Sequence, residues 1–138
     1  MFGGAGHDYL RGRGGDDHLD GGAGDDEIQG DAGEDKIYGG AGKDLILAGN
    51  GDDTVYGGDG DDDINAGRNA DDVHGGAGDD IIYGERGPDD LWGDDGNDTI
   101  RGGIGADIIR GGKGDDILLG GYQINGNDSE SDDDSDRE

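Results

Sequence analysis

The chain has 138 residues, of which 36 are glycine and only 28% are hydrophobic, and 37 acidic against 10 basic residues give a net charge of −27. This charge disfavours nucleic acid as a partner, because phosphate groups would be repelled. There is no cysteine, which excludes disulfides and thiolate metal sites, and we expect no membrane span because no segment is long and apolar enough. The composition is typical of a disordered chain, but a strict repeat overrules that interpretation.

The repeat begins almost at once. Met1 and Phe2 lead directly into it, so we expect no N-terminal signal peptide. Residues 3–119 are thirteen tandem nonapeptides without insertion or deletion, with the pattern Gly-Gly-x-Gly-x-Asp-x-aliphatic-x, as in GGAGDDEIQ at 21–29. Glycine adopts positive φ without steric cost, so the first six residues of each unit are predicted to form a loop. The last three are predicted to form a very short strand.

Two positions of the nonapeptide carry the same kind of residue in all thirteen units. The eighth is always Leu, Ile or Val, which supplies one core side chain per unit. The sixth is always aspartate: Asp8, Asp17, Asp26, Asp35, Asp44, Asp53, Asp62, Asp71, Asp80, Asp89, Asp98, Asp107 and Asp116. Burying one aliphatic side chain gains roughly 1.5–3 kcal/mol, whereas ordering nine residues costs about 1 kcal/mol or more each. A unit therefore cannot fold by itself, and folding requires a further bound species.

Two nonapeptides make one turn of eighteen residues. The predicted fold is all-β: a right-handed parallel β-roll of two sheets, one from odd units and one from even units, with the eighth positions stacked between them. We expect this domain to cover residues 1–124.

The loops stack as the strands do, so aspartates from loops n and n+2 face a shared space. Like charges in a row repel one another, whereas carboxylates and loop carbonyls together can surround a hard cation with oxygen. Ca²⁺ suits such a flexible cage better than Mg²⁺, which requires a tighter octahedron. The thirteen aspartates are therefore the candidate metal ligands. Seven odd and six even loops give at most about eleven shared sites.

The pattern resembles the calcium-binding nonapeptide of the repeats-in-toxin (RTX, hemolysin-type) family, over residues 3–119. The resemblance implies a parallel β-roll that is disordered without calcium and folded with it. It also implies secretion by a one-step type I exporter, with folding outside the cell. In that family the aspartate and loop carbonyls bind calcium, which the resemblance assigns to the thirteen sixth-position aspartates here.

Loops eight and ten depart most from the pattern. Loop eight has Ala66 at its first position, Asn69 at its fourth and Ala70 at its fifth, and loop ten has Glu85 at its second and Pro88 at its fifth. We predict that the site shared by these loops is the weakest. The alternative is that asparagine tolerates the left-handed conformation and the site survives.

The ninth positions of four successive even units carry rings, namely Tyr38, Tyr56, His74 and Trp92. They should form an outward ladder on one sheet. Stacking that stiffens the sheet is the favoured interpretation, and a stripe that binds a sugar or another partner is the alternative.

Other site types have little support in the sequence. The three histidines, His7, His18 and His74, lack zinc-site spacing and are interpreted as solvated surface residues. The carboxylates are spread evenly, with no nucleophile beside a base, so we expect no enzyme activity.

After Leu119 the pattern decays. Tyr122 and Ile124 are interpreted as a crude cap on the roll, and residues 125–138 as a disordered acidic tail. The tail lacks apolar residues, which leaves the export route open.

The leading hypothesis is a secreted, non-catalytic module that folds when it binds calcium. The alternative is a carrier or adhesion module of a larger secreted toxin, protease or surface protein, in which the ring ladder contacts a partner such as a cell-surface glycan.

Overall fold

The computed structural model describes residues 1–121, which form fourteen β-strands. The predicted cap residues Tyr122 and Ile124 and the acidic tail 125–138 lie outside the described residues. Within residues 1–121 no helix could cross a membrane. The strands are β1 (Phe2–Ala5), β2 (Tyr9–Gly14), β3 (His18–Ala23), β4 (Glu27–Ala32), β5 (Lys36–Ala41), β6 (Leu45–Asn50), β7 (Thr54–Asp59), β8 (Asp63–Arg68), β9 (Asp72–Ala77), β10 (Ile81–Arg86), β11 (Asp90–Asp95), β12 (Thr99–Ile104), β13 (Ile108–Lys113) and β14 (Ile117–Leu119).

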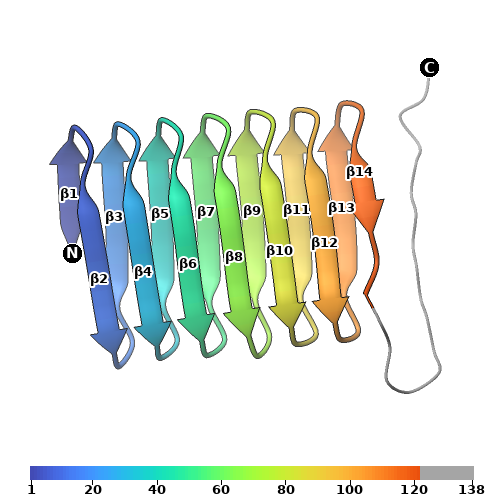
Figure 1. Ribbon diagram of the computed structural model, residues 1–138, viewed down its shortest axis with the longest axis horizontal. Coiled ribbons are helices and arrows are strands. Elements are labelled where there is room, and N and C mark those ends of the chain that lie inside the picture. The colour runs from blue at the N-terminus through green and yellow to red at the C-terminus, as the bar shows by residue number, and fades with distance from the viewer. Residues whose placement is uncertain (122–138) are drawn as a thin grey trace.

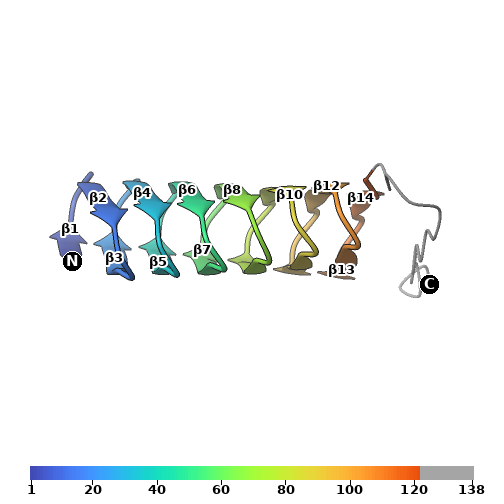
Figure 2. The same cartoon turned by 90° about the horizontal axis from the view of Figure 1, so that it is seen from below.

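The strands lie in two seven-stranded parallel sheets, one holding all odd-numbered strands and the other all even-numbered strands. Each residue pairs with the residue eighteen positions later, as Ile37 does with Val55. The chain crosses between sheets at every loop, so the two layers face each other along the whole rod (Figures 1 and 2). The predicted two-sheet parallel β-roll, with eighteen residues per turn, is confirmed.

The predicted strand boundaries are wrong. Most strands contain six residues, which are the last three of one nonapeptide and the first three of the next, as in β3 and β5. Only positions four to six form the loop. The first three positions join the sheet because their backbone pairs with identical positions one turn away, for example Gly22 with Gly40 and Ala23 with Ala41.

The core consists of two inward-facing positions. Along a strand, alternate side chains point to opposite faces, and the burial pattern shows positions eight and one buried with position nine between them half-buried. Position eight supplies a fully buried aliphatic side chain from Leu19 through Ile100, while Ile109 and Leu118 are only partly buried. Position one is glycine except at Ala48 and Ala66, whose methyl groups are also buried. The thin core predicted from the sequence is therefore real.

Positive φ occurs at the second and fourth positions of the units. Gly22 occupies the second position of the third nonapeptide and lies in β3. A Cβ on Gly22 would collide with the carbonyl oxygen of Gly4 in the neighbouring strand. The five non-glycine residues with positive φ, four at second positions and Asn69 at a fourth, have φ of 72–86°. Those values lie near the left-handed helical region, which side chains can occupy, whereas the glycines extend to 146°.

Candidate metal centre

The thirteen sixth-position aspartates form two stacks, one at each long edge of the roll where the loops lie. The two aspartates nearest each end of the repeat array are half-buried. The other nine are only 1–3% exposed although they carry ionisable groups: Asp26, Asp35, Asp44, Asp53, Asp62, Asp71, Asp80, Asp89 and Asp98. Carboxylates are almost never this buried without a partner.

In eleven of the thirteen carboxylates, those after Asp8 and Asp17 at the start of the two stacks, one oxygen has a backbone partner. The amide N–H of Asp44 donates to Asp62 Oδ1 at 2.8 Å, and the amide N–H of Asp62 donates to Asp80 Oδ1, also at 2.8 Å. The same bond joins successive aspartates in both stacks, with lengths up to 3.2 Å. These bonds fix the carboxylate of each turn against the loop of the turn before it.

The second oxygen has no such partner. Within residues 1–121, eleven Oδ2 atoms are buried without a hydrogen bond, those of Asp8, Asp26, Asp35, Asp44, Asp53, Asp62, Asp71, Asp80, Asp89, Asp98 and Asp107. Six belong to odd loops and five to even loops. Leaving a buried acceptor unsatisfied costs about 1–3 kcal/mol, and more when it is charged. A repeated cost of this kind points to a ligand for these oxygens.

Eight of the eleven unpaired oxygens lie beside a small space between a first-position glycine and a backbone carbonyl of the next turn. A Cβ added to Gly84 would lie 2.6 Å from Asp89 Oδ2 and 2.5 Å from the carbonyl oxygen of Gly102. Glycine at the first position keeps this space open. In the sixth and eighth units a methyl group stands there instead, that of Ala48 or Ala66.

Burial raises the pKa of nine of these carboxyl groups, because water no longer solvates the charge, and neighbouring aspartates raise the pKa further in eight of them. The backbone N–H bond to Oδ1 acts in the opposite direction but is the weaker effect. The pKa rises to about 6 for Asp53 and Asp98, to about 7 for Asp62, Asp80 and Asp89, and to about 8 for Asp71. The pKa values of Asp35, Asp44 and Asp107 are raised for the same reason.

Side chains alone do not make a metal cage. In the part of the chain that the structure describes, no three or more His, Cys, Asp or Glu side chains cluster in a way that could hold a metal ion. An ion in these loops would therefore need backbone carbonyl oxygens beside the carboxylates. All-oxygen coordination by carboxylates and carbonyls suits Ca²⁺, so the donor set fits this ion.

A family model for the RTX calcium-binding nonapeptide repeat, built on four copies, matches residues 1–28, 20–55, 38–73, 56–91 and 92–121. The chain belongs to the RTX calcium-binding nonapeptide repeat family. A search of curated proteins found no match. Family and fold together indicate a calcium-binding repeat module, and they agree with the resemblance inferred from the repeat.

Sequence reasoning missed a second row of side chains in the RTX loops, at the fifth position. Asp52 Oδ1 accepts the amide N–H of Ala70 at 3.1 Å, and Asp79 Oδ1 accepts that of Asn97 at 2.9 Å. The recurrence of Asp and Asn at this position could have revealed the row. It cannot continue through Ala70, which lacks an acceptor, or Pro88, which lacks an N–H.

The predicted ring ladder is confirmed on the odd-numbered sheet. Tyr38, Tyr56, His74 and Trp92 stack with centroids 5.2–5.5 Å apart and interplanar angles of 11–14°. Its ends are covered too, since His18 packs on Tyr38 at 5.4 Å and Arg110 lies 4.0 Å above the Trp92 ring centroid. The ring faces therefore contact one another and leave mainly their edges to solvent. This supports the stiffening interpretation, and partner binding by the ladder stays a hypothesis.

The histidines differ in their surroundings. His7 is exposed and its Nδ1 lies 2.9 Å from the carbonyl oxygen of Asp25. His74, interpreted from the sequence as solvated, is half-buried inside the ladder, with Nδ1 3.1 Å from Asp94 Oδ2 and Nε2 3.6 Å from Asp72 Oδ1.

Proposed function

We propose that this chain is a non-catalytic module whose folding is driven by calcium, with the thirteen sixth-position aspartates as carboxylate ligands. The observation that carries the proposal is the set of eleven buried, unpaired Oδ2 atoms, repeated every turn in both loop stacks. Their number equals the largest number of shared sites that thirteen stacked loops allow. A cation at each would supply the missing partner.

The energetics favour coupling between metal and fold. The core offers one aliphatic side chain per nine residues, and the metal-free roll buries carboxyl groups whose raised pKa reports the cost of their charge. An ion that binds only the folded state stabilises it, by about 2.7 kcal/mol per site at a concentration 100 times the dissociation constant. Several sites acting together would make folding steep in calcium concentration.

Calcium is favoured over magnesium because the carboxylates alone do not form a cage within residues 1–121, so the other oxygen donors would come from stacked backbone. Such a cage can supply the six to eight ligands at flexible distances that Ca²⁺ accepts, whereas Mg²⁺ retains waters and requires a near-ideal octahedron. About eleven Ca²⁺ ions would also offset most of the net charge of −27.

Secretion is consistent with the proposed coupling between calcium binding and folding. A chain that folds only in calcium would stay unfolded in low-calcium cytosol and fold outside the cell, as the RTX resemblance implies. A role as carrier or adhesion module of a larger secreted protein is compatible with this proposal, and its partner would be a separate question.

The test is far-ultraviolet circular dichroism during a calcium titration, with magnesium as the matched control. We expect a coil-to-β transition that is steep in calcium and absent in magnesium. The titration is done at about pH 8, where the raised carboxyl pKa values leave the metal-free chain least stable. A chain that is fully folded in chelator at this pH, or that folds equally well in magnesium, would refute the proposal.

A further inference from the structure

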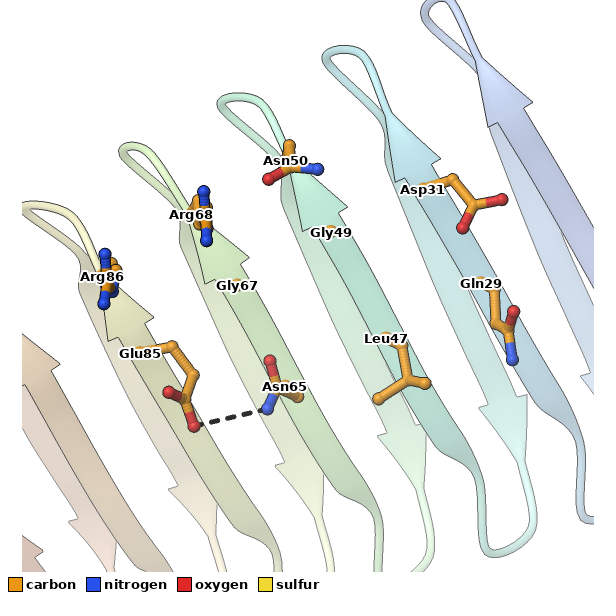
Figure 3. Close-up of a pocket in the computed structure, with 10 residues that line it drawn as sticks. All are labelled: Gln29, Asp31, Leu47, Gly49, Asn50, Asn65, Gly67, Arg68, Glu85 and Arg86. Atoms are coloured by element: carbon orange, nitrogen blue, oxygen red, sulfur yellow. Dashed lines mark hydrogen bonds between the residues drawn. The ribbon is translucent and has the colours of Figure 1, made fainter.

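A groove of about 550 Å³ runs along the outer face of the even-numbered sheet, across β4, β6, β8 and β10 (Figure 3). Its floor is the backbone of Gly49 and Gly67, which occupy the second positions of the sixth and eighth nonapeptides and lie in the neighbouring strands β6 and β8. The side chains of Asp31 and Glu85 occupy the same row and close its ends. No loop aspartate of the calcium sites lines it, so it is a separate surface.

Arg68 and Arg86 form one wall of this groove. They lie opposite each other in the register of β8 and β10, one strand spacing or about 4.8 Å apart along the rod. Both are exposed, and neither makes an ion pair within residues 1–121, whereas Arg11 pairs with Asp31 at 2.5 Å and Arg110 pairs with Asp90. Two adjacent guanidinium groups repel each other until an anion lies between them, and they bind carboxylates through paired hydrogen bonds.

The loops beside this wall keep the buried sixth-position aspartates Asp71 and Asp89 but lack an acidic residue at the exposed fifth position. In the even loops the fifth position is acidic at Asp16, Glu34 and Asp52, but the next two are Ala70 and Pro88. On a chain of net charge −27, the Arg68–Arg86 pair therefore lies beside two loops in which the exposed fifth position carries no negative charge.

The remaining polar groups are amides and carboxylates. Asn65 lies on the wall opposite the arginines, and its Nδ2 is 3.5 Å from Glu85 Oε1, a weak bond that leaves both groups able to bind other partners. Gln29 lies on the same wall, but its amide is already bonded to Glu27 and Tyr9. Amides and carboxylates bind hydroxyls, as donors and as acceptors. Asp31 at one end is paired with Arg11, and the carboxylate of Glu85 at the other end would repel a ligand charged along its whole length.

We propose that this groove binds an acidic sugar: a carboxylate held by Arg68 and Arg86, with neighbouring hydroxyls bound by Asn65 and Glu85. An isolated negative charge would bind the two arginines, and hydroxyls beside it would bind Asn65 on the opposite wall and Glu85 at the end. The ring ladder on the opposite sheet is a poorer sugar site, because its ring faces are already stacked on one another.

The test uses the full chain in calcium, with its fold first checked by circular dichroism. This check separates the two proposals, since a chain that stays unfolded in calcium contradicts calcium-driven folding, while a folded chain that fails to bind contradicts the groove. The probes are a disaccharide of glucuronic acid and glucose and its neutral all-glucose counterpart, studied by ligand-observed NMR at a fixed free calcium concentration. We expect the acidic disaccharide to bind at least about tenfold more tightly.

Variants locate the binding. Arg68→Gln/Arg86→Gln should abolish the preference for the acidic disaccharide, and Arg68→Lys/Arg86→Lys should weaken it, because lysine keeps the charge but not the paired hydrogen bonds. The matched control is Lys36→Gln/Lys113→Gln, which changes the charge equally on the odd-numbered sheet and should bind as the unaltered chain does. Equal binding of both disaccharides, or an equal loss in the control, would overturn the proposal.

Other occupants would give different results, each of which would also overturn it. Tighter binding of a peptide of residues 126–138 than of the sugar would assign the groove to the acidic segment of this chain. Sedimentation of a dimer that Arg68→Gln/Arg86→Gln converts to a monomer would assign it to a second copy. Displacement of the sugar by inorganic sulfate at equal concentration would show that the arginines bind any small anion.

Discussion

The loops of the odd units and those of the even units share one register and one stacked row of aspartates, yet they differ in composition. The first and fourth positions are glycine in every odd unit, whereas the even units carry Ala48, Ala66 and Asn69 there. Positive φ nevertheless recurs at the second and fourth positions of the units in both stacks. Pairing between residues eighteen positions apart therefore determines the backbone conformation, whereas the residue at the first position determines how much space is left beside each aspartate.

The sharpest way to probe this comparison is to remove one carboxylate from the regular stack. Asp62 accepts a backbone hydrogen bond from Asp44 and donates one to Asp80, so Asp62→Ala changes the sites on both sides of its loop. We expect the calcium midpoint of folding to rise by about tenfold or more and the transition to become less steep. Circular dichroism during calcium titration measures both quantities.

The control for that variant is Asp61→Ala, which removes the same charge from the exposed fifth position next to it. Its midpoint should change little. An unchanged midpoint in Asp62→Ala, or equal shifts in the two variants, would mean that the sixth-position carboxylates do not bind calcium.

The next effect concerns pH and both stacks together. Because the pKa values of Asp62, Asp80 and Asp89 are about 7 and that of Asp71 is about 8 when folded, the metal-free roll holds more protons than the unfolded chain between about pH 4 and 8. Its stability therefore falls as pH rises through this range. We expect metal-free protein to show most β-structure near pH 5 and to lose it by about pH 8.

If the proposed function holds, calcium should reverse the direction, because protons and metal would compete for the same carboxylates. The calcium midpoint should rise as the pH is lowered from 8 to 6. Circular dichroism of metal-stripped protein across this range, with and without calcium, checks both signs. A metal-free chain whose β-structure grows with rising pH would contradict the assignment of the raised pKa values.

The third test makes the even stack resemble the odd stack. Ala66→Gly removes the methyl group beside Asp71, and Asn69→Gly relieves a left-handed side chain, so the double variant should bind calcium at the site of loops eight and ten a few times more tightly. Calorimetry resolves the weakest site as the last to fill. The matched control is Ala77→Gly, at a strand position of an odd unit, and a double variant that fills no earlier would show that this site is not weakened by its departures from the repeat.

The sequence predicts much of this structure because its period is strict. Aspartate and aliphatic residues at fixed positions every nine residues determined the two sheets, the register of eighteen, the buried row from Leu19 to Ile100 and the ladder from Tyr38 to Trp92. The strand boundaries could not be predicted, because glycines carry no hydrophobic pattern and their positive φ usually marks a loop. Only the pairing of Gly22 with Gly40 shows that the sheet continues through them.

The hydrogen bonding of each carboxylate could not be predicted from the sequence either. An invariant aspartate indicates a ligand, but the division between a bonded Oδ1 and an unpaired Oδ2 depends on where the amide of the preceding turn lies. The Arg68–Arg86 groove was missed for a related reason. Its two walls come from the ninth positions of odd units and the third positions of even units, which become neighbours only when the strands alternate between sheets.

The smallest predicted effect concerns the outer faces of the two sheets and not the two loop stacks. Tyr56 stacks on Tyr38 at 5.2 Å and on His74 at 5.3 Å, so Tyr56→Ala removes two aromatic contacts from the odd-numbered sheet. Each contact is worth about 0.5–1.5 kcal/mol beyond the area buried. In saturating calcium, urea unfolding should show a loss of about 1–3 kcal/mol. Leu47→Ala on the even-numbered sheet, where Leu47 is 38% exposed and has no ring partner, should cost clearly less, and equal losses would mean that the ladder adds nothing to stability.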